Sequence, residues 1–151
     1  MTIGSFRPTP EQQLLLLAAL LGGPEAAEAF ESWATRVNFD LLDQGSYRIL
    51  PALHANLRTR GVTHPLMSRL QSVSRAAWYR NQLLRHRGAD VVRSLESAGL
   101  ETLLLKGAAL VASGYVDVGA RPMSDVDILV RRRDANAAMD TLLAAGWEPW
   151  P

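Results

Sequence analysis

Two acidic residues stand directly before a run of three apolar residues in the second half of the chain. They are Asp125 and Asp127, and Ile128–Val130 follows them. The apolar run predicts a strand, and alternate side chains of a strand share a face. We therefore expect both carboxylates to point the same way, about 7 Å apart at Cα, with Val126 packed on the other face. This stretch predicts a β-element that presents a pair of acids.

A second apolar run precedes the acids by about twenty residues. Leu100–Leu105 predicts a strand, which stops at Lys106-Gly107. Residues 108–112 then suit a short helix, and residues 114–122 suit a loop. A glycine just past a strand lets backbone N–H groups approach a phosphate, and a lysine can reach a phosphate as a point charge. The competing interpretation is a plain turn glycine beside a solvated lysine.

The paired carboxylates predict a divalent metal site. Mg²⁺ prefers oxygen ligands and often takes one or two carboxylates together with phosphate oxygens of a substrate. We expect Asp125 and Asp127 to bind Mg²⁺ or Mn²⁺ and to be the catalytic residues. Arg121 could hold a β- or γ-phosphate, or it could pair with an acid nearby. Ser124 could bind a phosphate, orient Asp125 or cap a turn.

The ordered motifs in this region resemble those of a known group of enzymes. The motifs are Lys106-Gly107, Tyr115, Arg121-Pro122-Met123 and Ser124–Val130. They resemble the bacterial uncharacterised nucleotidyltransferase family of the DNA polymerase β-like superfamily. The resemblance covers the second half of the chain well and the helical first half only in character.

The resemblance implies transfer of a nucleoside monophosphate from a nucleoside triphosphate (NTP) to an acceptor, which could be a protein, an RNA or a small molecule. It implies nucleotide contacts by Lys106, Gly107, Arg121 and Ser124. Two departures stand out. Ala108 replaces the serine that usually follows the glycine. The family's third carboxylate lies on a later strand, which we do not expect this chain to reach. We therefore expect a fragment of a longer protein, a site completed by a partner, or a catalytically inactive chain.

Helical patterns fill the first half of the chain. A capping box at Thr9 predicts a helix that ends near Gly22. Further patterns predict helices from Pro24 to about Val37, a short one ending near Gly45, and one over Ser46–Arg60. Proline disfavours a helix interior, so Pro51 predicts either a kink or a late start to this last helix.

One long helix, or two split near Gly88, is predicted between residues 64 and 97. One side of this pattern is apolar and the other is rich in arginine. These arginines could meet an anionic substrate, since guanidinium pairs well with phosphate, or they could form a solvated face.

The remaining pattern predicts a helix from about Asp134 to Ala145 and the start of a strand at Trp147. The fold class expected is α+β. A helical region, residues 1–97, is followed by a partial polymerase β-like nucleotidyltransferase core, residues 98–151. This core should hold a small mixed sheet with flanking helices and end before its third carboxylate strand.

Composition limits the compartment and the partners. The chain has 151 residues, no cysteine and a net charge of +1, so disulfides and thiolate sites are excluded and bulk charge does not favour nucleic acid. No signal pattern opens the chain, and no apolar run approaches the roughly 20 residues of a membrane span. We expect a cytoplasmic protein without a membrane partner. Unpaired strand edges would favour a homo-oligomer.

Three functions remain open on the sequence. The first is a metal-dependent nucleotidyltransferase, or its N-terminal portion. The second is a non-catalytic nucleotide-binding, regulatory or interaction module that keeps the scaffold. The third is a glycosyltransferase that uses Asp-x-Asp to hold a metal and a nucleotide-sugar. In the third class the acids typically follow an apolar strand, whereas here Ile128–Val130 comes after them.

Overall fold

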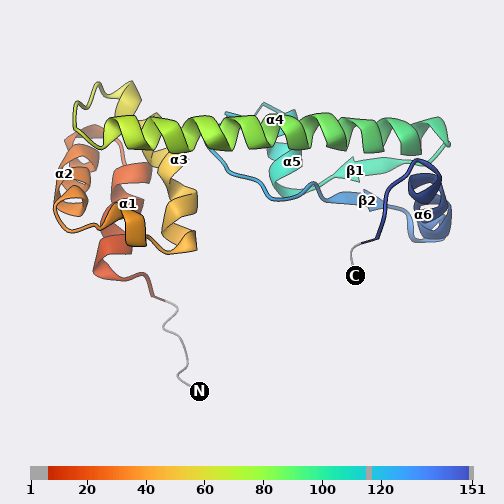
Figure 1. Cartoon of the computed structure of the whole chain (residues 1–151), viewed down its shortest axis with the longest axis horizontal. Helices are drawn as coiled ribbons and strands as arrows, with labels where there is room; N and C mark the ends of the chain where they lie inside the picture. Colours follow the sequence, from red (N-terminus) through yellow and green to blue (C-terminus); the bar gives the residue numbers. More distant parts are fainter. Residues whose placement is uncertain (1–6, 115–116, 150–151) are drawn as a thin grey trace, which may run out of the picture. The chain divides into compact units, whose positions relative to one another are not determined.

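The computed structural model describes residues 7–114 and 117–149. Over these residues it contains six α-helices, two 3₁₀ helices and two strands (Figure 1). The contacts divide the chain into two compact units. The first holds the residues up to Trp78 together with 119–122, and the second holds Tyr79–Val118 and the chain from Met123 onward. The expected division at residue 97 stays a prediction.

The first unit opens with two helices, α1 (Pro10–Leu20) and α2 (Gly23–Ala34). The predicted capping box is confirmed. The backbone N–H of Gln12 donates to Thr9 Oγ1 at 3.2 Å, and the Thr9 N–H donates to Gln12 Oε1 at 2.9 Å. This exchange satisfies two N–H groups that have no partner inside the helix.

A 3₁₀ turn, η1 (Phe39–Leu41), replaces the short helix predicted before Gly45, and α3 (Gln44–Thr59) follows it. The Asp43 side chain caps α3 by accepting from the Ser46 N–H at 3.0 Å. The late start suggested by Pro51 is wrong, because α3 begins well before this proline. Pro51 lies buried inside the helix, where it removes one backbone hydrogen bond.

The core of the first unit is aliphatic and aromatic. Phe30 and Trp33 of α2 pack with their ring centroids 6.2 Å apart. Small residues on α1 let its neighbours approach closely. The buried cluster consists of Leu15, Ala18, Ala19, Ala29, Phe30, Trp33, Leu50, Leu53, Leu57 and Leu70.

The long helical pattern forms a single helix, α4 (Met67–Ser97), of 31 residues (Figure 1). The alternative of two helices split at Gly88 is therefore wrong. Glycine lowers helix stability by only about 1 kcal/mol relative to alanine, which the packing of a long helix can offset. The second unit begins within this helix, at Tyr79.

The sheet of the second unit pairs β1 (Thr102–Leu104) with β2 (Ile128–Val130). The strands are antiparallel, and Leu103 lies opposite Leu129. Leu103 and Leu129 are exposed, whereas the residues on either side of them are half-buried. The mixed sheet expected from the sequence is not found among the described residues, whose two strands are antiparallel.

Three further helical segments complete the second unit: α5 (Lys106–Ala112), η2 (Arg132–Asp134) and α6 (Ala135–Ala144). Gly146 follows α6 at φ +83°, the left-handed conformation that a glycine just past a helix commonly adopts. Residues 147–149 form no strand, so that prediction is wrong as far as the structure describes it. Within the described ranges, no helix combines the length and apolarity that crossing a membrane requires.

Candidate functional site

The bend between β1 and α5 places Lys106 in an unusual backbone conformation. β1 ends at Leu104 and α5 begins at Lys106, so Leu105 alone connects them. Lys106 has φ +50°, in the left-handed region. This region costs a residue with a Cβ atom about 1–2 kcal/mol. Strain of this kind is common at functional sites, where the surrounding structure maintains it.

The side chain of Lys106 meets one of the two predicted catalytic acids. Its Nζ donates to Asp127 Oδ1 at 3.1 Å, across 21 residues of sequence. The lysine side chain is 70% exposed and the aspartate side chain 33%. The Leu105 N–H also donates to the Asp127 carbonyl oxygen at 3.0 Å, which continues the strand pairing by one residue. The backbone of Asp127 is therefore fixed next to the Lys106 bend.

The other acid lies in the irregular segment that leads into β2. The prediction that a strand already includes Asp125 is wrong, because β2 begins at Ile128. Asp125 and Ser124 are both exposed. Val126, between the acids, is half-buried against α4. A shared direction for the two carboxylates stays a prediction.

Asn81 of α4 holds the chain just before the acids, and sequence reasoning missed it. Its side chain is fully buried. Its Nδ2 donates to the Val118 carbonyl oxygen, and its Oδ1 accepts from the Met123 N–H at 2.9 Å. A buried polar side chain is stable only when such bonds are made. Asn81 therefore joins both ends of the turn that precedes Ser124.

The sequence pattern around Asn81 does indicate a buried polar residue. The apolar stripe of α4 runs through Val73, Ala77 and Leu84, and Asn81 lies on the same face, four residues after Ala77. A polar residue inside an apolar stripe indicates a buried hydrogen-bonding role. Its two backbone partners are 37 and 42 residues away in sequence, so the stripe alone could not name them.

Gly88 of α4 gives the acid segment room to approach the helix. A Cβ atom at this position would lie 3.2 Å from both γ-carbons of Val126, tighter than normal packing. Glycine thus allows Val126 to contact the helix backbone. The sequence suggested a helix break at this position, whereas the structure shows a close contact.

The other predicted site residues are placed as follows. Gly107 is buried at the second position of α5. Arg121 is exposed and falls in the 119–122 stretch of the first unit, so its contact with phosphate stays a prediction. Tyr115 lies outside the described residues. Of the predicted set, the structure brings Lys106 and Asp127 into direct contact.

Asp125 and Asp127 stay the predicted ligands of a hard divalent cation, which would complete its coordination with oxygens of a substrate. The described residues contain no group of three or more histidine, cysteine or acidic side chains able to hold a metal by themselves. Two carboxylates are nonetheless an ordinary protein contribution to a Mg²⁺ site, where water and phosphate supply the remaining oxygens. Asp127 already has a cation, the Lys106 ammonium, at one carboxylate oxygen.

Comparison with known proteins identifies the family of the chain. No curated protein and no solved structure matches the chain. Residues 46–150 match the family described as uncharacterised nucleotidyltransferase. This match covers more than two thirds of the 151 residues and includes α4, β1, α5 and β2. The chain therefore belongs to the uncharacterised nucleotidyltransferase family.

Proposed function

We propose that this chain is a metal-dependent nucleotidyltransferase, or the N-terminal portion of one. Its substrate is a nucleoside triphosphate, and its acceptor is a hydroxyl-bearing protein, RNA or small molecule. In the reaction an acceptor oxygen attacks the α-phosphorus. The bond from that phosphorus to the bridging oxygen breaks, and pyrophosphate leaves. Asp125 and Asp127 are the proposed metal ligands and catalytic residues.

The main chemical difficulty is charge. A triphosphate repels an incoming nucleophile, and negative charge increases on the leaving oxygens. A bound Mg²⁺ or Mn²⁺ would neutralise part of this charge on the nucleotide. Asp125 and Asp127 would hold this cation, and the Lys106 ammonium would add a second positive charge that attracts the phosphates.

The observation that carries the proposal is the contact between Lys106 and Asp127. The two opposite charges lie 3.1 Å apart at a solvent-accessible position and partly neutralise each other. Asp127 would gain a stronger partner in a bound metal ion, and Lys106 would gain one in a phosphate of the nucleotide. The Lys106 amine extends from a strained bend in the backbone. The same bend holds Asp127 through the hydrogen bond from the Leu105 N–H to the Asp127 carbonyl oxygen.

Binding of ATP tests the proposal without knowledge of the acceptor. We expect isothermal titration calorimetry to show binding of ATP to the full chain in MgCl₂ and much weaker binding in EDTA. Asp127→Asn should reduce the MgCl₂-dependent part of the affinity at least about tenfold, since a charged ligand to the metal is lost. Lys106→Met should weaken ATP binding both with and without the metal.

Asp140→Asn provides a matched control, because Asp140 is an exposed aspartate on α6. It should bind ATP as the wild type does. Equal affinity in MgCl₂ and EDTA, or no effect of Asp127→Asn, would disprove the proposed metal site. Metal-dependent ATP binding, with no release of pyrophosphate from ATP whichever acceptor is offered, would favour the non-catalytic nucleotide-binding module instead.

A further inference from the structure

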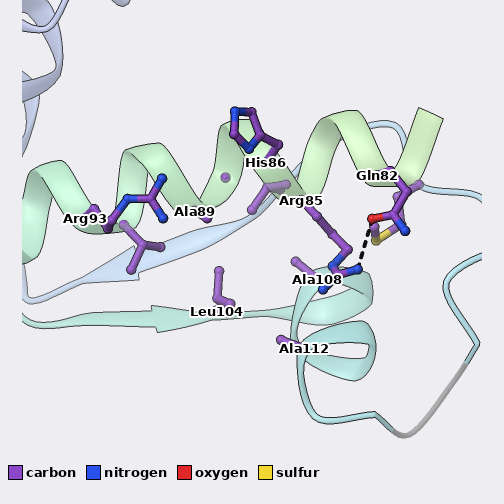
Figure 2. A pocket seen from close by; sticks show the side chains of 12 residues that line it. Gln82, Arg85, His86, Ala89, Arg93, Leu104, Ala108 and Ala112 are labelled. Atoms are coloured by element: carbon purple, nitrogen blue, oxygen red, sulfur yellow. Dashed lines mark hydrogen bonds between the residues drawn. The ribbon is translucent and has the colours of Figure 1, made fainter. Parts of the chain in front are cut away.

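A pocket lined by neither of the two acids lies within the second unit, where Val126 of the acid segment meets α4. Its volume is about 570 Å³, within the range of small-molecule sites. Figure 2 shows its wall along α4 and its opposite wall on β1 and α5. Its apolar lining consists of Ala89, Val92, Leu104, Ala108, Ala112, Met123 and Val126, with Gly88 beside them.

The polar residues of this pocket are basic or neutral. Gln82, Arg85, His86 and Arg93 line it, and no carboxylate does so among the residues described. The pocket therefore joins an apolar interior to a rim that favours negative charge. A ligand with both properties, an apolar body and an anionic group, is complementary to it.

Arg85 is the cation of this rim best placed to meet a ligand. Arg93 pairs with Asp90, whose carboxylate also lies 3.8 Å from His86 Nε2. The guanidinium of Arg85 instead donates to the neutral Gln82 Oε1 at 3.0 Å. Figure 2 shows the Arg85 side chain extending from α4 toward Ala108 at the start of α5. Its charge is thus directed to the pocket and is not cancelled by its neutral partner.

We propose that this pocket binds a compact amphiphilic carboxylate, which places its carboxylate on Arg85 and its apolar body between α4 and β1. A guanidinium can donate two parallel hydrogen bonds to a carboxylate, which gives both affinity and orientation. The apolar residues that line the rest of the pocket offer aliphatic surface to the body of the ligand, and no carboxylate among the described lining residues would repel its charge. This inference does not depend on the proposed transfer of nucleotides.

A pair of probes with the same ring system tests the two halves of the proposal. 2-Naphthoate carries the carboxylate, and 2-naphthalenemethanol is its neutral counterpart. We expect calorimetry with the full chain to show tighter binding of the naphthoate. Arg85→Gln should weaken naphthoate binding about ten- to a hundredfold, the effect of losing a hydrogen bond to a charged group, and should leave the alcohol unchanged.

Two further variants distinguish this pocket from general surface binding. Ala112 is exposed at the pocket wall, so Ala112→Phe should fill the pocket without disturbing the fold. This variant should therefore bind both probes more weakly than the wild type. Arg87→Gln is the matched control, because Arg87 is an exposed arginine of the same helix that does not line the pocket. It should bind both probes as the wild type does.

The outcomes are decisive in either direction. Methyl NMR shifts centred on Leu104 and Val126, together with the expected effects of the variants, would support the site. The proposal is overturned if naphthoate binds no better than the alcohol, or if Arg87→Gln weakens it as much as Arg85→Gln. Circular dichroism of each variant confirms that a loss of binding is not a loss of fold.

Discussion

Replacing Asn81 by leucine should loosen the segment that carries the two acids. The leucine side chain is similar in size but cannot hydrogen-bond. Asn81→Leu therefore leaves the Val118 carbonyl and the Met123 N–H without their buried partner. The helix itself should persist, because leucine is a better helix former than asparagine. The effect should thus be confined to the contact between α4 and the acid segment.

The size of the effect follows from the two bonds that are lost. An unsatisfied buried polar group costs about 1–3 kcal/mol. Two such groups, partly relieved by water, should lower the free energy of local opening of this segment by about 2–4 kcal/mol. The amide of Met123 is buried in the wild type, so it reports this loss directly.

Hydrogen exchange measured by NMR provides the assay. The Met123 amide should exchange at least about tenfold faster in Asn81→Leu than in the wild type, since each 1.4 kcal/mol is a factor of ten. Amides in α1 and α2 of the first unit should exchange as before. Asn136→Ala serves as the control, because Asn136 is an exposed asparagine on α6.

The pH dependence of the stability of Asn81→Asp provides a second test of this hydrogen-bonding role. The introduced carboxylate, when ionised, would still accept from Met123 but would face the Val118 carbonyl without a proton to donate. When protonated, the same carboxyl group could make both bonds. Its pKa should therefore be higher in the folded state than in the unfolded state, and the stability deficit of the variant relative to the wild type should shrink as the pH falls. Unchanged Met123 exchange in Asn81→Leu, or a deficit in Asn81→Asp that grows on acidification, would refute the assigned role.

Three further predictions concern packing, capping and strain. Gly88→Ala should destabilise the chain less when combined with Val126→Ala than alone, because the smaller side chain relieves the 3.2 Å contact; a double-mutant cycle by urea unfolding measures the coupling. Hydrogen bonds from the Ser46 side chain and backbone lower the pKa of Asp43 from 3.8 to about 2. The stabilisation by Asp43 is thus complete above pH 3.8 and lost as the pH falls through about 2, and Asp43→Ala should cost about 1 kcal/mol at neutral pH and nothing at the lowest pH. The free energy of unfolding should be about 1 kcal/mol higher for Lys106→Gly than for Lys106→Ala, because glycine adopts φ +50° without the strain that a Cβ atom causes.

The sequence predicted the helices of the first half well because their ends carry local signals. Thr9 and Gln12 form the capping box that their spacing indicated. Pro51 misled the prediction, since packing around a buried proline outweighs one lost backbone hydrogen bond. Local signals decide such boundaries only where tertiary packing does not oppose them.

The site was harder to predict because its contacts are distant in sequence. The motif pointed to Lys106 and Asp127 separately, and the structure joins them. The short strand β2 excludes Asp125, because pairing needs a partner and β1 ends at Leu104. The left-handed conformation of Lys106 could not be predicted from residue type, since lysine seldom adopts it.

The path of α4 decides how this protein could be dissected. Asn81 and Gly88, which secure the approach to the acids, precede β1 by more than a dozen residues. A recombinant piece beginning at residue 98 would keep every motif residue and lose both of these supports. The family match starts at residue 46, ahead of the whole of α4. The smallest fragment able to display the acids correctly should therefore include this helix.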